Sequence, residues 1–324
     1  MATPIWEPSS DQIASAPMSA FIRRAAEVSG QPIADYRALH RWSIEDREAF
    51  WGLFWDFCDV IGEKGAKVLQ DGDRMPGARF FPEARLNFAE NLLRRKGSSE
   101  AIIFRGEDKV VRRWSWDELA AMTSRMRQLF EAHGIKEGDR VAAMMPNMPE
   151  TVAAMLAAAS LGAVWSSCSP DFGPQGVLDR FGQIEPAIFI APDGYWYAGK
   201  QNDVSAKAKE IVAKLPTVRA TIMVDYLGTA RQAATAIPGA TSLDDAIAPY
   251  TAKPIDFAQL PFDHPLYILF SSGTTGIPKC IVHSAGGTLI QHLKEQRLHV
   301  GVLPEERIFW FATCSWMMWN WLVS

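Results

Sequence analysis

The stretch Leu266-Tyr-Ile-Leu-Phe-Ser-Ser-Gly-Thr-Thr-Gly-Ile-Pro-Lys279 decides the fold of this chain. Its first five residues, Leu266 to Phe270, are apolar and favour β-structure, so they predict a buried strand. Two glycines, four hydroxyl residues and a proline follow, and these residue types end regular structure. The stretch is therefore predicted to be a strand that leads directly into a loop.

The residues of this loop are suited to hold phosphate groups. Glycines let the backbone bring its N–H groups close to an anion, hydroxyl side chains add donors, and Lys279 adds a positive charge that can meet a polyphosphate. A flexible surface turn between two strands is the alternative that composition alone leaves open. The predicted phosphate ligands are Ser271, Ser272, Gly273, Thr274, Thr275, Gly276 and Lys279.

The order of residues distinguishes this loop from other phosphate loops. In the motif Gly-x-x-x-x-Gly-Lys-Ser/Thr the lysine directly follows the second glycine, whereas here Ile277 and Pro278 intervene and Cys280 follows Lys279. The sequence Ser-Ser-Gly-Thr-Thr-Gly-Ile-Pro-Lys instead resembles the signature loop of the adenylate-forming superfamily, which includes the acyl-CoA synthetases. In that family the loop holds the β and γ phosphates of ATP, so the resemblance implies that Lys279 stabilises phosphate charge during catalysis.

Composition excludes several other classes of protein. With 324 residues, 48% of them apolar, the chain can build a sizeable core and two or three domains. Its 33 basic and 37 acidic residues give a net charge of −4, which does not indicate a nucleic-acid partner. Four widely spaced cysteines have no metal-ligand spacing and are expected to be reduced thiols. No metal ligand is predicted.

Neither export nor membrane insertion is expected. The N-terminus lacks the basic and apolar regions of an export signal, so a cytoplasmic location is predicted. Residues 151–168 are uncharged but rich in alanine and interrupted by Gly162, which favours a buried helix that leads into a strand. Residues 308–323 are too few for a span, which needs about 18 residues, and they contain Asn320.

The N-terminal part is predicted to be a helical extension over residues 1–90, since residues 19–69 have the apolar spacing of helices. Residues 80–91 resemble the segment that leads into the nucleotide domain of short-chain acyl-CoA synthetases. Aromatic residues crowd the helical part, and we expect them to pack in the core rather than bind a ligand. They are Trp42, Phe50, Trp51, Phe54, Trp55 and Phe57.

Residues 91–324 are predicted to form an α/β domain with a mostly parallel sheet covered by helices, because strand and helix patterns alternate along the chain. Residues 101–105 and 109–114 predict a hairpin, and Ser115 with Glu118 predicts a capping box that begins a helix. The further predicted strands are 140–145, 163–167, 187–190 and 220–224, and the further predicted helices are 149–161, 175–184 and 204–215.

The segments on either side of the phosphate loop are less regular in pattern. Residues 228–261 are predicted to be a surface excursion with one short helix near 242–248. After the loop, residues 280–283 predict a strand, and Ser284 is expected to cap a helix that reaches about Val300. Residues 307–312 predict one more strand.

Further motifs extend the resemblance over roughly residues 30–324. Residues 138–142, 146–150 and 161–164 follow the order found in acyl-CoA synthetases after their first hairpin. Residues 166–173 and 178–186 resemble the branch of the family that acts on acetoacetate, whereas acetyl-CoA synthetases have Gly-Gly-Phe in place of Pro170-Asp171-Phe172. Acetoacetate is therefore the implied small-molecule substrate, with acetate or propionate as alternatives.

The resemblance also implies contacts for the acid and for coenzyme A. Acetyl-CoA synthetases place two arginines that contact coenzyme A near residues 193–200, where only Lys200 is basic in this chain and Tyr197 is not. Residues 314–320 align with the stretch that lines the acyl pocket, which implies Trp316, Met317 and Met318 as its walls, although plain core packing is the alternative.

As part of a longer enzyme, the chain is expected to take part in ATP-dependent ligation of acetoacetate to coenzyme A through an acyl-adenylate, with Mg²⁺ as the metal. The family places its adenine and Mg²⁺ ligands, its ribose-binding aspartate and its catalytic lysine beyond the point that Ser324 reaches. The chain is therefore expected to be an N-terminal portion with its domain incomplete and to be inactive alone. A non-catalytic fragment that at most binds phosphates is the competing hypothesis.

Overall fold

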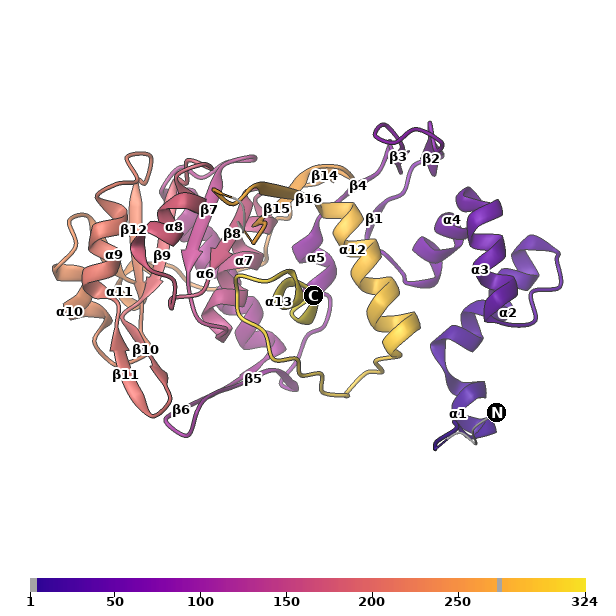
Figure 1. The fold of residues 1–324 in the computed structure, drawn as a ribbon, viewed down its shortest axis with the longest axis horizontal. Coiled ribbons are helices and arrows are strands. Elements are labelled where there is room, and N and C mark those ends of the chain that lie inside the picture. The colour runs from indigo at the N-terminus through magenta and orange to yellow at the C-terminus, as the bar shows by residue number, and fades with distance from the viewer. Residues whose placement is uncertain (1–4, 273–275) are drawn as a thin grey trace.

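The computed structural model describes residues 5–272 and 276–324. Its centre is a seven-stranded sheet (Figure 1). In spatial order the strands are β13 (Ala240–Ser242), β12 (Ala220–Val224), β9 (Ile188–Pro192), β7 (Arg140–Met144), β8 (Val164–Cys168), β15 (Pro265–Phe270) and β16 (Cys280–Ser284). All neighbours are parallel except β15 and β16. The predicted mostly parallel α/β sheet is confirmed.

Helices cover both faces of this sheet, because its central strands are apolar on both sides. Alternate residues of β9 belong to two separate cores: Ile188 and Ile190 to one, Phe189 and Ala191 to the other. The first core is completed by α6 (Trp116–Ala132), α7 (Pro149–Ser160), α11 (Leu243–Ile247) and α12 (Ala285–Leu293). The second is completed by α8 (Pro174–Phe181), α9 (Ser205–Val212) and α10 (Ala230–Thr235).

The helices α6 and α7 show how sequence signals set local structure. The predicted capping box is confirmed at the start of α6, where the Ser115 N–H donates to Glu118 Oε2 (2.7 Å) and the Glu118 N–H donates to Ser115 Oγ (3.2 Å). Every residue of α7 is buried, so the predicted buried helix leading into a strand is confirmed. No helix in the described part of the chain is both long and apolar enough to cross a membrane.

The N-terminal region consists of helices followed by small sheets. Phe21, Phe50 and Phe54 pack there with ring centroids 5.7 to 6.5 Å apart, which confirms that the aromatic residues form core. The first run of helices ends at Phe57 rather than near Leu69, and Asp59 just after it has φ +50°, a conformation in which an α-helix does not continue. The helices are α1 (Ser10–Ser15), α2 (Pro17–Ser29), α3 (Tyr36–Glu45), α4 (Arg47–Phe57) and α5 (Phe88–Leu92). The short strands of this region are β1 (Gly62–Glu63), β2 (Leu69–Gln70), β3 (Arg79–Phe80) and β4 (Arg85–Leu86), and β14 (Leu260–Pro261) from later in the chain pairs with β4.

Two hairpins flank the main sheet. The predicted one is confirmed as β5 (Glu100–Gly106) with β6 (Val110–Ser115), whereas β10 (Gly194–Tyr197) with β11 (Lys200–Asp203) was not predicted. Residues 228–261 are not simply a surface excursion, since α10 and β13 extend the sheet at its edge. The small side chains of Ala230, Ala233 and Ala234 are buried against it. The short helix α11 in this region is confirmed.

Two predictions after the phosphate loop need correction. The predicted helix begins after Ser284 and reaches Val300, but it is an α-helix, α12, only to Leu293 and then a π-helical segment, η1 (Lys294–Val300), and the Ser284 side chain makes no capping hydrogen bond among the described residues. The strand predicted at 307–312 is absent, because none of the described strands pairs with this segment. The chain instead runs without regular structure to α13 (Met317–Leu322).

Candidate functional site

The carboxyl ends of β7, β8 and β15 lie along one edge of the sheet, since these strands are parallel. Polar residues follow each strand there: Asn147 after β7, Ser169 after β8 and Ser271 after β15. In open α/β sheets ligands bind outside the carboxyl ends of the strands. This edge is therefore the candidate functional site.

The predicted phosphate loop leaves the sheet at this edge, and its two ends are joined. The Ser271 N–H donates to the Lys279 carbonyl (3.0 Å), and the Lys279 N–H donates to Ser271 Oγ (2.9 Å). These bonds continue the antiparallel pairing of Phe270 with Cys280. Gly276 has φ +147°, a conformation that L side chains rarely adopt, although open space surrounds it. Backbone conformation rather than room thus requires a glycine.

The structure places the predicted phosphate ligands only in part. Ser272, Gly276 and Lys279 are exposed at the surface, while Ser271 is half-buried at the base of the loop. Gly273, Thr274 and Thr275 lie outside the described residues. Of the predicted ligands that the structure describes, Ser271 and Lys279 are joined at the base of the loop, and Lys279 is exposed.

The helix α8 and the residues after it support both ends of the loop, which the sequence analysis missed. Gln183 Nε2 donates to the Pro278 carbonyl (2.8 Å). The Arg180 guanidinium lies 4.6 Å from the centroid of the Phe172 ring and 5.9 Å from that of Phe270, the last residue of β15. Such contacts are cation–π interactions. Arg180 therefore connects the segment after β8 with the start of the phosphate loop, and only the tertiary structure reveals this.

The segment after β8 contains the residues that departed from acetyl-CoA synthetases. Lys207 of α9 donates from Nζ to the carbonyls of Pro170 (2.6 Å) and Phe172 (3.1 Å), and the Ser169 hydroxyl contacts the Asp171 carboxylate. Burial lowers the pKa of the Lys207 ammonium, while the nearby Asp171 carboxylate opposes that shift. The position of this segment is thus set by a lysine that sequence patterns did not single out.

The predicted acid-pocket stretch packs across the ends of β7 and β8. Ser167 Oγ donates to the Cys314 carbonyl (2.7 Å), and the Ser169 N–H donates to Ser315 Oγ (3.0 Å). Trp319 of α13 is fully buried, and its Nε1 donates to Asn147 Oδ1 (2.9 Å). The stretch therefore lies at the same edge of the sheet as the phosphate loop.

Within that stretch the predicted pocket residues are not the anchors. Trp316 and Met317 are exposed and Met318 is half-buried, whereas Trp319 and Asn320 are buried. Trp319 therefore supplies the packing of this stretch within the described residues, whereas Trp316 and Met317 are exposed there.

The predicted coenzyme A contact lies apart from the loop. Lys200 is exposed on β11, opposite Tyr197 in the second hairpin. This hairpin contacts the hairpin of β5 and β6, because the Gly199 N–H donates to Glu107 Oε2 (2.9 Å). Figure 1 shows β10 and β11 in the lower part of the view and the strands β15 and β16 in its upper part. The structure does not bring Lys200 and Lys279 together.

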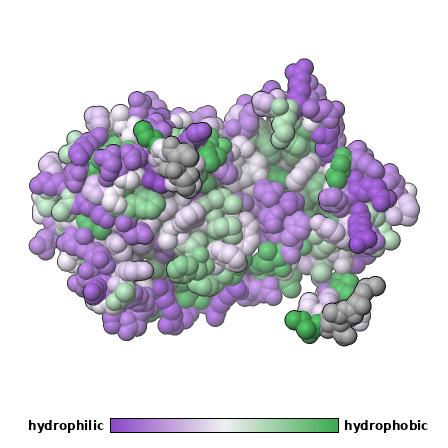
Figure 2. Space-filling model, viewed as in Figure 1, coloured by the Kyte–Doolittle hydropathy of each residue, from purple (hydrophilic) through white to green (hydrophobic). Residues whose placement is uncertain are grey.

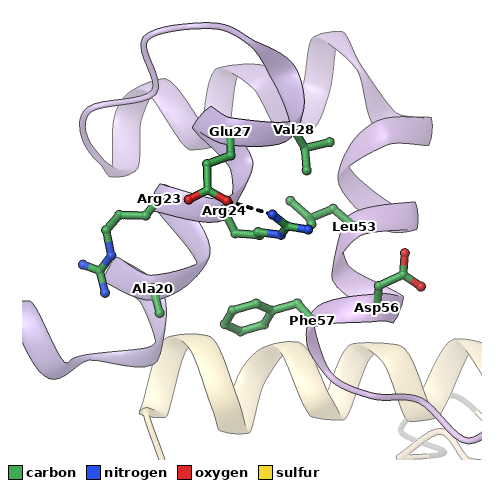
Figure 3. A pocket seen from close by; sticks show the side chains of 8 residues that line it. All are labelled: Ala20, Arg23, Arg24, Glu27, Val28, Leu53, Asp56 and Phe57. Carbon is green, nitrogen blue, oxygen red and sulfur yellow. Dashed lines mark hydrogen bonds and ion pairs between the residues drawn. The ribbon is translucent and has the colours of Figure 1, made fainter.

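A hollow of about 490 Å³ lies elsewhere, between α2 and α4 (Figure 3). Three of its four charged side chains have partners: Arg24 pairs with Glu27 (2.8 Å) and Asp56 pairs with Lys64 (2.7 Å). None of the predicted site residues lines it. We assign no function to this hollow.

Comparison with known proteins identifies the family. The family described as AMP-binding enzyme matches residues 88–323, and the one described as acetyl-coenzyme A synthetase N-terminus matches residues 36–92. The chain therefore belongs to the AMP-binding enzyme family. Its sequence-based assignment to the adenylate-forming enzymes is confirmed.

Particular relatives are acetoacetyl-CoA synthetases. That of Rhizobium meliloti (strain 1021) is 60% identical, over 99% of this chain and 49% of the relative, and that of Macaca fascicularis is 39% identical, over 99% and 48%. A solved acetoacetyl-CoA synthetase from Streptomyces lividans is 42% identical with a TM-score of 0.92, over 99% of this chain and 49% of that one. The chain is a homologue of these synthetases and spans about half of their length.

Proposed function

We propose that this chain provides the phosphate loop and part of the acid pocket of an ATP-dependent acid–thiol ligase that joins acetoacetate to coenzyme A. One observation carries the proposal. In a chain 60% identical to an acetoacetyl-CoA synthetase, a loop of Ser, Gly, Thr and Lys leaves the carboxyl edge of a parallel sheet with its ends joined by Ser271 and Lys279.

The reaction requires activation of the acid. A carboxylate is a poor acylating agent because its leaving group would be oxide, so its oxygen first attacks the α-phosphate of ATP and pyrophosphate leaves. The thiolate of coenzyme A then displaces AMP from the acyl-adenylate. In the first step the protein's task is to align the reactants and to stabilise the charge that develops on the leaving phosphates.

The loop residues supply these donors. Ser271 Oγ accepts the Lys279 N–H, which leaves its own O–H free to donate to a phosphate oxygen. Lys279 is exposed, so its ammonium can follow the phosphates as they separate. The backbone around Gly276 approaches the anion without a side chain in the way. Gly273, Thr274 and Thr275 complete the proposed set.

The remaining proposed contacts concern the acid, coenzyme A and the metal. Trp316, Met317 and Met318 line the pocket that binds the acid, and the flexible thioether side chains of the two methionines adapt to an acid longer than acetate. Lys200 contacts coenzyme A. Mg²⁺ accompanies ATP in this family, but no residue is assigned to it, since the described residues contain no group of three or more His, Cys, Asp or Glu placed for a metal.

The proposal also includes a division of the chain and its location. Residues 1–90 form the helical extension and residues 91–324 the AMP-binding domain. The enzyme works in the cytoplasm on small molecules. The alternatives are ligation of acetate or propionate, and a fragment that binds phosphates without catalysis.

A chimaera tests the function. This chain replaces the matching part of the Rhizobium meliloti relative, and release of AMP and pyrophosphate is measured with ATP, coenzyme A and each acid, with the relative itself as control. We expect turnover with acetoacetate above that with acetate or propionate, and none from the 324-residue chain alone. A folded chimaera that prefers another acid would correct the substrate, and one inactive with every acid would overturn the ligase role.

A further inference from the structure

The helix α9 carries two neighbouring lysines, Lys207 and Lys209, whose surroundings differ because residues two positions apart lie on different faces of a helix. Lys209 is exposed, in keeping with the mainly hydrophilic surface that Figure 2 shows where Figure 1 places α9 and α10. Lys207 is half-buried, and its Nζ donates to the carbonyls of Pro170 (2.6 Å) and Phe172 (3.1 Å). One ammonium thus binds the backbone after β8 at two points, and we call residues 169–172 the clamped turn.

The clamped turn has hydrogen bonds of its own, and the lysine adds the charged ones. The Ser169 hydroxyl contacts the Asp171 carboxylate, and the Phe172 N–H donates to the Ser169 carbonyl (3.3 Å). Hydrogen bonds from a charged donor are shorter and stronger than those between neutral groups. The two bonds from Lys207 therefore contribute strongly to holding the backbone of this turn in one conformation.

The base of the Lys207 side chain is itself fixed. Ala208 and Ile211, on the same helix, are fully buried, and they belong to the core that also contains Val177 and Phe181 of α8. A group that positions others is most effective when it stands on a rigid, well-packed element. The helix α9 therefore gives Lys207 a fixed point from which it holds the clamped turn.

The first residue of the clamped turn contacts the stretch proposed to line the acid pocket. The Ser169 N–H donates to Ser315 Oγ (3.0 Å), and Ser315 directly precedes Trp316 in the chain. The Ser315 hydroxyl also lies 3.3 Å from that of Thr313, on the other side of the fully buried Cys314. A displacement of Ser169 would therefore displace Ser315 and the residue after it.

We propose that Lys207 is a positioning residue for the acid pocket: by holding the clamped turn, it fixes Ser315 and the adjoining wall in the arrangement that binds acetoacetate. The inference rests on the proposed function, because it concerns the acid of that reaction. Without the ammonium the wall must be ordered when the acid binds, so the acid binds more weakly. The phosphate loop keeps the bonds between Ser271 and Lys279 and the one from Gln183, so binding of ATP is spared.

Steady-state kinetics of the active chimaera test this role. Lys207→Met removes the ammonium but keeps an apolar stem, and it should raise the KM for acetoacetate about tenfold while the KM for ATP changes less than about twofold. Lys207→Arg keeps the charge and its donors and should recover most of the loss. Lys209→Met is the matched control on the same helix and should leave both KM values unchanged. Asp171 is exposed, so Asp171→Ala loosens the same turn without removing core and should change the acetoacetate KM in the same direction.

A double-mutant cycle tests the route through Ser315. If Lys207 acts by way of Ser315, the variant that combines Lys207→Met with Ser315→Ala should bind acetoacetate no more weakly than the weaker of the two single variants. Hydrogen exchange should become faster at residues 169–172 in Lys207→Met and remain unchanged within β9. Effects on KM that multiply in the double variant would show that the two residues act independently and would overturn the route.

The outcomes separate this inference from the proposed function. A parent chimaera that is inactive with every acid would overturn the proposed function and this role with it. If the parent is active but Lys207→Met leaves the acetoacetate KM unchanged, only this inference fails. A merely structural lysine would lower the melting temperature with both KM values unchanged, and equal rises in both KM values would exclude a specific role in the acid pocket.

Discussion

The helix α7 and the segment from Ile308 to Phe311 are both mainly apolar, yet α7 is buried along its whole length while the four residues of the segment are exposed. The difference lies in their neighbours. The helix α7 packs against α5 and α6 and contributes to the core beside the sheet, whereas no described element covers residues 308–311. Apolar composition therefore gives a segment a tendency to be buried, but burial occurs only where another element packs against it.

The same contrast extends to charge. Glu150 lies on α7 and is buried, yet it pairs with Arg112 of β6, which also donates to the Asp225 carbonyl (2.7 Å). Burial raises the pKa of the Glu150 carboxyl, and the Arg112 guanidinium opposes the shift. The Glu150 carboxylate is tolerated in the protein interior because the fold places Arg112 beside it. Aromatic residues 309–311 remain exposed to solvent because the fold places no described apolar element against them.

Two phenylalanine substitutions sharpen this comparison most strongly. Phe189→Ala should destabilise the chain by about 3 to 5 kcal/mol, because Phe189 is fully buried against Phe181 of α8 and its removal leaves a cavity. Phe311→Ala should change stability by no more than about 0.5 kcal/mol, since its side chain is already in water. Urea unfolding of both variants measures this, and equal losses would contradict the difference in burial.

A buried histidine should make the α12 region sensitive to acid. Burial is the main cause that lowers the pKa of His292 to about 4; the charge of His283 adds to the shift, and Glu295 opposes it. The Nδ1 atom of His292 lies 2.8 Å from Ser324 Oγ. The unfolded chain therefore binds the proton more readily between pH 6.5 and about 4. Unfolding free energy should fall by about 3 kcal/mol as the pH decreases through this window.

Thermal melts from pH 7 to 4 test this, with His292→Gln compared with the parent chain. The variant should lose this part of the pH dependence, whereas His40→Gln, at an exposed site, should keep it. If the parent chain and the His292→Gln variant had parallel profiles of stability against pH, protonation of His292 would not change the free energy of unfolding.

At the exposed loop the expected effect is on rate rather than on folding. In the active chimaera, Lys279→Ala should slow pyrophosphate exchange about tenfold to a hundredfold, the equivalent of roughly 1.5 to 3 kcal/mol for a lost charge-assisted contact. Lys214→Ala, at another exposed lysine, should not. Unchanged exchange in the Lys279 variant would remove this residue from the proposed phosphate set.

A more modest effect on stability is expected at the contact between the segment after β8 and the loop after β15. Arg180→Met removes the cation–π contacts with Phe172 and Phe270 and should cost about 0.5 to 2 kcal/mol of stability. Arg180→Lys keeps the charge and should lose less. Hydrogen exchange should speed up after β8 and at Ser271 and Ser272 but not within β9. Unaltered exchange at both loops would mean that Arg180 does not hold them.

Much of the fold could be predicted because its signals are local. The hairpin of β5 and β6, the capping box of α6 and the strand β12 depend on periodicity and on neighbouring residues, and they lie where the patterns predicted. The edge strand β13 was missed, because three residues of mixed pattern become a strand only when β12 pairs with them. The predicted strand at 307–312 failed for the opposite reason, since its residues favour a strand but lack a partner.

The sequence by itself determined the family, the position of the predicted phosphate loop between β15 and β16, and the residue types proposed to bind phosphate, because these depend on the order of residues along a short stretch. Tertiary structure decided that Arg180, Gln183 and Lys207 support that site and that Trp319, rather than Met317, anchors the acid-pocket stretch. It also decided which apolar residues are covered. Contacts between elements far apart in the chain depend on how helices and strands pack, and no local pattern contains that information.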